Sequence, residues 1–288
     1  MNTLKTTVLL ALLTALFMGI GLLLGGQNGM VVALIFSVGL NFSMYWFSDK
    51  LILKTYRAEE LSQEEAPEIH RIVSNLAEKA NIPKPKVYMI PQEMPNAFAT
   101  GRNPQHAAIA VTKGLTQILD NNEIEAVLAH EISHVINRDT LISVIAASLA
   151  GAISMLAVMA RWGALLGGRR RRGGNIFVVL ALSIIAPLAA AVIQMAISRS
   201  REYKADRAAG KLTGRPQALA SALKKLEAQN HRESEKPAQQ ATAHMFIVNP
   251  FSGRGQQSQR RRSHSSLFST HPPVQKRVNE LQKMARGL

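Results

Sequence analysis

The chain has 288 residues and a formal net charge of +15, from 34 Lys and Arg against 19 Asp and Glu. Its hydrophobic content of 47% excludes an intrinsically disordered protein, and its charged content of only 18%, together with long uncharged runs, indicates a membrane protein with a basic water-facing part. The absence of cysteine excludes disulfides and thiolate metal sites, so any zinc ion must be held by His and carboxylate side chains.

The first two apolar runs predict a helical membrane hairpin. Residues 6–26 and 30–48 carry no charge, and each is close to the ~20 residues that a helix needs to cross a bilayer. A cleaved signal peptide is the alternative for the first run, but a second span follows it at once. Lys5 before the hairpin and Lys50 and Lys54 after it place both ends in the cytoplasm by the positive-inside rule.

The segment that follows the hairpin predicts a small α+β unit. Apolar residues recur with helical spacing over residues 66–80, and residues 86–90 and 107–112 have the pattern of short strands. A further helix is expected to open at Asn121 and Asn122, with an Asn cap and a carboxylate three residues later. We expect this helix to run on into the third apolar run.

The third and fourth apolar runs, residues 141–160 and 176–198, are also long enough to cross a membrane. The block Arg169–Arg172 lies between them, so two full crossings would place four arginines outside, against the positive-inside rule. A tilted, partly re-entrant or packed hairpin would avoid this conflict. The arginine block is then either a solvated loop or a site for anionic lipid head groups.

Beyond the fourth run, residues 218–229 predict an amphipathic helix, residues 252–269 a mobile basic loop, and Pro272 and Pro273 the start of a last helix. The expected organisation is a membrane hairpin (1–48), a first cytoplasmic part (49–139), a second hairpin (140–198) and a second cytoplasmic part (199–288). The predicted fold class is α+β and predominantly helical, with four apolar membrane helices.

The motif His130-Glu131-Ile132-Ser133-His134 carries the chemistry of this chain. Two His residues four positions apart lie on one side of a helix and can share one metal ion. Glu131 lies about 100° further round the helix, where it can reach a metal-bound water. The motif therefore predicts a zinc hydrolase.

A catalytic zinc ion needs three protein ligands, and Glu202 and Asp206 lie four residues apart on one helix face. One of them can bind the metal while the other holds a ligating imidazole through its free N–H. Pairing with neighbouring basic residues on a solvated surface is the alternative. If the third and fourth runs form a hairpin, both halves of the site return to the same, cytoplasmic, membrane surface.

Four segments of the chain, taken together, match one known pattern: Asn96–Ala99, His130–Asp139, Glu202–Asp206 and Ser269–Pro273. With the four apolar runs they resemble the HtpX family of membrane zinc metalloproteases, relatives of the CAAX prenyl proteases and the mitochondrial Oma proteases. The resemblance covers nearly the whole chain and implies a gluzincin-like catalytic domain, with Glu202 as the third zinc ligand and Asp206 supporting His130. It implies a multi-pass enzyme of the bacterial inner (plasma) membrane that degrades misfolded or damaged membrane proteins under stress.

The expected mechanism follows from these parts. Glu131 takes a proton from the zinc-bound water and passes it to the leaving amine. His271 is the first candidate for the oxyanion donor, and Tyr203 is a weaker one. Asn96, Ala97, Phe98 and Ala99 are expected to form an exposed edge that pairs with the substrate backbone, or else an ordinary hairpin turn. Asn137 and Asp139 are expected to end the helix.

Two other functions fit part of the sequence. One is a non-enzymatic membrane scaffold whose basic loops bind anionic lipid or nucleic acid, and the other is a substrate-specific processing peptidase of the prenyl-protease type. We expect instead membrane-protein substrates, one zinc ion per chain, contact with the lipid bilayer and no nucleic-acid partner. The sequence does not specify an oligomeric state.

Overall fold

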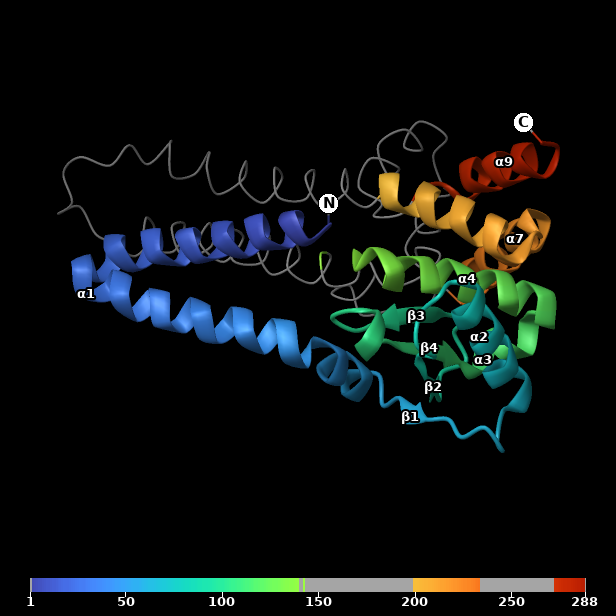
Figure 1. Cartoon of the computed structure of the whole chain (residues 1–288), viewed down its shortest axis with the longest axis horizontal. Coiled ribbons are helices and arrows are strands. Elements are labelled where there is room, and N and C mark those ends of the chain that lie inside the picture. Colours follow the sequence, from blue (N-terminus) through green and yellow to red (C-terminus); the bar gives the residue numbers. More distant parts are fainter. Residues whose placement is uncertain (1, 140–141, 143–198, 234–271, 288) are drawn as a thin grey trace. The chain divides into compact units, whose positions relative to one another are not determined.

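The structure, a computed structural model, describes residues 2–139, 142, 199–233 and 272–287, which divide into two compact units (Figure 1). Among the described residues, the first unit contains Thr3–Met44 and Ile142, and the second contains Asn2 and residues 45–139, 199–233 and 272–287. The third and fourth apolar runs (apart from Ile142), the Arg169–Arg172 block and the basic loop lie outside the described residues.

Helix α1 (Asn2–Thr55) is helical along its whole length but reverses direction at Gly26, whose φ of 61° is a left-handed value that glycine adopts without strain. Contacts join the two arms: Asn41 donates a hydrogen bond to Thr14 (2.9 Å), and the rings of Phe17 and Phe36 lie 5.5 Å apart. This is the expected helical hairpin.

Its second arm, Gly26–Phe47, is the one described helical stretch that is long and apolar enough to cross a membrane. The apolar part of the first arm, Leu10–Leu22, is shorter. Of the four spanning helices expected from the sequence, the described part of the chain therefore shows one.

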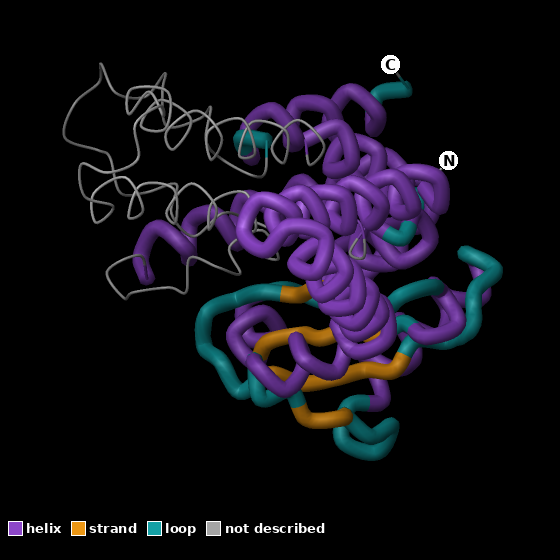
Figure 2. The backbone as a smooth tube through the Cα atoms, turned by 90° about the vertical axis from the view of Figure 1, so that its left-hand side faces the viewer, coloured by secondary structure: helices purple, strands orange, loops and turns teal. Residues whose placement is uncertain are grey.

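The second unit contains a four-stranded sheet (Figure 2). Its order is β1 (Glu59–Glu60), β2 (Lys86–Ile90), β4 (Ala108–Thr112) and β3 (Ala97–Thr100), with β2 and β4 parallel and the outer strands antiparallel to their neighbours. The predicted strands at 86–90 and 107–112 are confirmed. Strand β3 is an edge strand, but its side chains are buried, so the expectation of an exposed segment was wrong for the side chains.

Helices pack on this sheet and on one another. Besides residues 199–213, which are helical, they are α2 (Pro67–Lys79), η1 (Pro104–His106), α3 (Lys113–Ile118), α4 (Asn121–Asn137), α7 (Pro216–Glu233) and α9 (Val274–Ala285). The helices expected at 66–80, at 218–229 and after Pro273 are confirmed. Helix α4 contacts α2, β3 and α7, and its Leu128 and Ile132 are fully buried in one hydrophobic core. The core therefore fixes the helix that carries the His motif.

Both ends of α4 differ from the sequence prediction. The amino-terminal cap is Asp120, not an Asn: its carboxylate accepts hydrogen bonds from the backbone N–H groups of Asn122 and Glu123, while the Glu123 side chain accepts from the Asp120 N–H. At the other end the helix stops at Asn137, because Arg138 adopts a left-handed conformation with φ of 54°. The expected continuation of α4 into the third apolar run was therefore wrong.

Candidate metal centre

Helix α4 and the helix formed by residues 199–213 bring the three predicted metal ligands together. His130 and His134 lie one turn apart on α4, with their Nε2 atoms 3.1 Å from each other. Glu202 faces both rings, with Oε2 3.6 Å from His130 Nε2 and Oε1 3.6 Å from His134 Nε2. Ligand atoms of the three side chains lie within 4.8 Å of one another, so the group could hold one metal ion.

A different carboxylate orients each imidazole. Asp206 Oδ1 lies 3.0 Å from His130 Nδ1, and Asp139 Oδ2 lies 3.0 Å from His134 Nδ1. An ionised carboxylate can only accept a hydrogen bond, so in a neutral imidazole the Nδ1–H would face the carboxylate and Nε2 would keep its lone pair for a metal ion. Two imidazoles with one carboxylate suit zinc. The residues present therefore fit a zinc ion.

Arg277 on α9 completes the support of His130, and the sequence analysis missed it. Its fully buried guanidinium donates to both oxygens of Asp206 (2.8 and 2.6 Å) and lies 3.4 Å from Glu202 Oε2. Burial alone would raise the pKa of the Asp206 carboxyl, but Arg277 and His130 outweigh it and lower this pKa to about 2. Asp206 therefore stays ionised. In the sequence, a lone arginine on the apolar face of α9 is the feature that could have indicated a buried partner for a carboxylate.

Asp139 was expected only to end the helix, and the structure shows it also holding His134. Arg201 donates to the backbone carbonyl of Asp139 (3.0 Å) and lies 3.7 Å from its carboxylate. The left-handed turn at Arg138 brings Asp139 back beside the helix, and periodicity does not reveal such a turn. Asn137 is the last residue of the helix, as expected, and its side chain donates to the Ser133 carbonyl (2.8 Å).

Glu131 lies between the two histidines in sequence and is 6% exposed. Its Oε2 accepts a hydrogen bond from the backbone N–H of Ala99 in β3 (2.9 Å). Burial raises the pKa of the Glu131 carboxyl, while the two neighbouring histidines oppose this rise. The carboxylate thus sits beside the metal-ligand group and against the edge strand.

The outer edge of β3, on the side away from β4, faces this carboxylate. The Thr112 N–H donates to the Asn96 carbonyl, so in this antiparallel register Ala97 and Ala99 direct their backbone groups away from β4. The bond from Ala99 to Glu131 agrees with that direction. The side chains of Asn96 and Phe98 are each only 3% exposed, so this segment offers its backbone rather than its side chains.

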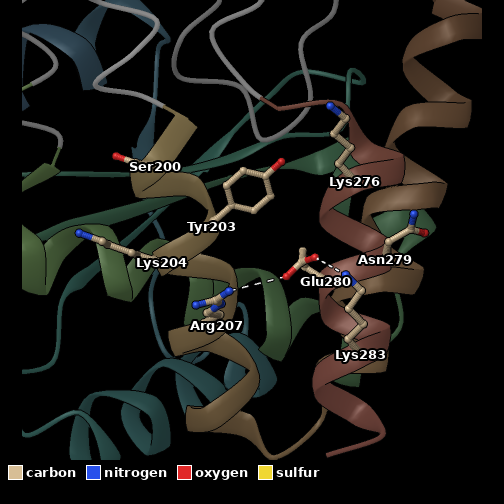
Figure 3. Close-up of a pocket in the computed structure, with 8 residues that line it drawn as sticks. All are labelled: Ser200, Tyr203, Lys204, Arg207, Lys276, Asn279, Glu280 and Lys283. Carbon is tan, nitrogen blue, oxygen red and sulfur yellow. Dashed lines mark hydrogen bonds and ion pairs between the residues drawn. The ribbon is translucent and has the colours of Figure 1, made fainter. Parts of the chain in front are cut away.

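The two candidates for oxyanion donor are not placed in this group. His271 lies outside the described residues. Tyr203 follows Glu202 directly, but it lines a separate pocket with Ser200 and Lys276 (Figure 3).

Comparisons with known proteins agree in the family that they indicate. The profile of Peptidase family M48 matches residues 63–285. A protease HtpX homolog from Pyrococcus furiosus is 53% identical over 283 residues, covering 98% of this chain and 95% of that relative. A second, from Desulforapulum autotrophicum, is 52% identical over 98% of this chain and 89% of its own length. A third, from Persephonella marina, is 51% identical over 100% of this chain and 99% of its own length.

A solved structure, the crystal structure of S. mikatae Ste24p, is similar with a TM-score of 0.58 at 22% sequence identity. The match covers 96% of this chain but only 62% of that chain. At this identity the likeness concerns the fold alone.

Proposed function

The chain belongs to peptidase family M48 and is a metalloprotease, and we propose that it is a zinc endopeptidase that degrades misfolded or damaged membrane proteins. The observation that carries this proposal is the convergence of His130, His134 and Glu202 beside the buried carboxylate of Glu131. The same group explains why a chain without cysteine can hold a catalytic metal.

In this proposal His130, His134 and Glu202 hold one zinc ion per chain. Bound zinc supplies Lewis acidity and lowers the pKa of a coordinated water to about 7. Asp206 and Asp139 keep the two imidazoles in the tautomer that directs Nε2 to the ion.

Glu131 is the proposed general base. It takes the proton of the attacking water and returns it to the leaving amine. Its hydrogen bond from Ala99 fixes the carboxylate at the edge of the sheet, where an extended peptide would lie. Burial raises the pKa of the Glu131 carboxyl and the two histidines oppose this rise, and this balance suits a group that must gain and lose a proton.

Strand β3 is the proposed substrate site. An extended peptide would add to its outer edge, on the side where Ala97 directs its backbone groups and where the Ala99 N–H holds Glu131. Recognition of backbone rather than side chains suits unfolded substrates of varied sequence. His271, just before α9, remains the proposed donor to the oxyanion of the tetrahedral intermediate.

The proposed location is the inner (plasma) membrane, with the catalytic unit on the cytoplasmic side and more than one membrane crossing. The apolar stretch Gly26–Phe47 supports membrane attachment, and Lys50 and Lys54, which follow it, support the orientation.

The test compares wild type, Glu131→Gln and Glu125→Gln, each as the full chain purified in detergent. Glu125 lies earlier on the same helix and pairs with Lys79 and Arg215, so its substitution is a matched control. We expect all three to bind about one zinc ion, and only Glu131→Gln to lose cleavage of an unfolded membrane protein, by about 100-fold or more.

The outcomes separate the alternatives. Zinc binding without cleavage of any unfolded membrane protein would favour a processing peptidase with a narrow substrate. A folded wild type that binds no zinc would contradict the metal site itself and favour the scaffold.

A further inference from the structure

A pocket of about 550 Å³ lies between the helix of residues 199–213 and α9, on the sides of these helices that do not face the metal centre (Figure 3). Glu202 and Asp206 leave one side of the first helix towards the histidines, whereas Ser200, Tyr203 and Arg207 line the pocket. Both helices belong to the second unit, so the pocket lies within one compact body.

The pocket has an excess of positive charge. Lys204, Arg207, Lys276 and Lys283 line it, and Glu280 is the one acidic residue of its lining. Glu280 already pairs with Lys283 (2.9 Å) and with Arg207 (3.6 Å). Within the described part of the chain, no acidic partner lies in salt-bridge range of Lys204 or Lys276.

Hydrogen-bond donors accompany these charges. Tyr203 and Lys276 reach towards the space between the two helices, and Ser200 lies one turn before Tyr203 (Figure 3). The phenol of Tyr203 and the ammonium group of Lys276, both directed towards this space, can each donate a hydrogen bond to an oxygen of a phosphate group (Figure 3).

The two helices run in the same direction, which places the pocket at a defined point of the chain. Asp206 contacts Arg277 and Arg207 contacts Glu280, so residue numbers rise together along both helices. The Ser200 end of the pocket therefore lies beside the amino-terminal end of α9 and at the first described turn of the other helix. In the sequence, Ser200 comes two residues after the fourth apolar run, the predicted membrane segment that ends at residue 198.

We propose that this pocket binds the phosphate of an anionic phospholipid headgroup at the membrane surface. The membrane attachment that this requires is part of the proposed function. A phosphate between Tyr203 and Lys276 would link the two helices whose opposite sides carry Glu202 and Arg277. The lipid would thus hold the second half of the metal centre to the last helix.

For the test, the full chain is placed in vesicles of phosphatidylcholine and phosphatidylglycerol and then extracted from them. Native mass spectrometry measures how much phosphatidylglycerol stays bound to the extracted protein. The variant is Lys204→Gln with Lys276→Gln. Its control, Lys211→Gln with Lys224→Gln, removes the same charge from exposed positions that do not line the pocket. We expect several-fold less retained phosphatidylglycerol in the pocket variant, and wild-type retention in the control.

A second arm distinguishes a lipid from a free phosphate compound. Glycerol 3-phosphate and inorganic phosphate, at millimolar concentration, are expected to displace phosphatidylglycerol from wild type only weakly, because they lack the membrane anchor. Equal lipid retention in the pocket variant and the control would overturn the proposal. So would tight binding of inorganic phosphate that leaves lipid retention unchanged.

This readout does not depend on proteolysis. A wild type that cleaves its substrate but shows no pocket-dependent lipid retention would overturn the lipid site and leave the proposed protease intact. An inactive chain that retains phosphatidylglycerol through Lys204 and Lys276 would support the lipid site and contradict the proposed protease.

Discussion

At the level of single residues, the two histidines of the metal centre are supported in unequal ways. His130 relies on Asp206, which is buried and held by the guanidinium of Arg277. His134 relies on Asp139, which is held by Arg201 at the end of α4. Loss of either carboxylate should loosen the metal, but only the first leaves a fully buried arginine without its main partner.

This difference predicts distinct effects of two similar substitutions. Asp139→Asn and Asp206→Asn should each lower zinc affinity about 10- to 100-fold, because a weaker acceptor orients the imidazole less firmly. Asp206→Asn should in addition destabilise the fold by about 3 kcal/mol, since the buried Arg277 loses its charged partner. Zinc competition with a coloured chelator and denaturant unfolding of the zinc-free chain measure the two effects. An equal loss of stability in both variants would contradict this account.

The metal ligands could be predicted from the sequence, but not all of the residues that hold these ligands in place could be predicted. His130 and His134 follow from their spacing four residues apart on a helix, which is a local property. Spacing left Glu202 and Asp206 as alternatives for the third ligand, and the family resemblance selected Glu202. Arg277 meets Asp206 across 71 positions of chain, and only the tertiary packing of α9 brings them together. Asp139 depends on one left-handed residue, Arg138, which no hydrophobic period reveals.

At the level of elements, hydrogen bonds fix the amino-terminal end of α4. The Asp120–Glu123 capping box satisfies the first backbone N–H groups of the helix. The buried Glu123 carboxylate also accepts hydrogen bonds from Ser221 and Lys225 of α7 (2.7 Å each), so the cap joins two helices. The position of the His motif therefore depends on an anchor more than one turn away.

Removal of the cap should weaken the fold without touching the metal ligands. Asp120→Ala is expected to cost about 1 kcal/mol of unfolding free energy, while Asn121→Ala, one residue inside the helix, should cost less than half of that. Denaturant titration of the two variants beside wild type measures both. A larger loss for Asn121→Ala would show that the cap is the Asn expected from the sequence.

The elements themselves were predictable to differing degrees. Helix α2 shows a clear period of 3.6 residues and strand β2 is a short apolar run, and both were found at nearly their observed bounds. The order of the sheet was not predictable, because strands of four or five residues carry too little pattern to fix their partners. Burial of the β3 side chains was missed for the same reason.

At the level of the whole chain, the metal centre joins two parts of the sequence that the third and fourth apolar runs, residues 141–160 and 176–198, separate. His130 and His134 precede these runs and Glu202 follows them. A metal ion held by all three would therefore act as a cross-link that only the folded chain provides.

Metal removal should accordingly lower thermal stability. At a zinc concentration 1,000-fold above Kd, binding adds about 4 kcal/mol to the unfolding free energy, so a strong chelator should lower Tm by several degrees. Glu202→Gln, which weakens the cross-link, should show a smaller chelator-dependent shift of Tm. Differential scanning fluorimetry of both proteins in detergent provides the measurement, and equal shifts would argue against Glu202 as a ligand.

The position of Arg277 has a consequence for the order of biosynthesis. The ribosome releases His134 and Asp139 early, so one half of the centre can form while the chain is still growing. His130 must wait for Asp206, and Arg277 of α9, which holds Asp206, is made later still. A nascent chain therefore lacks the full support of His130 until α9 has emerged from the ribosome.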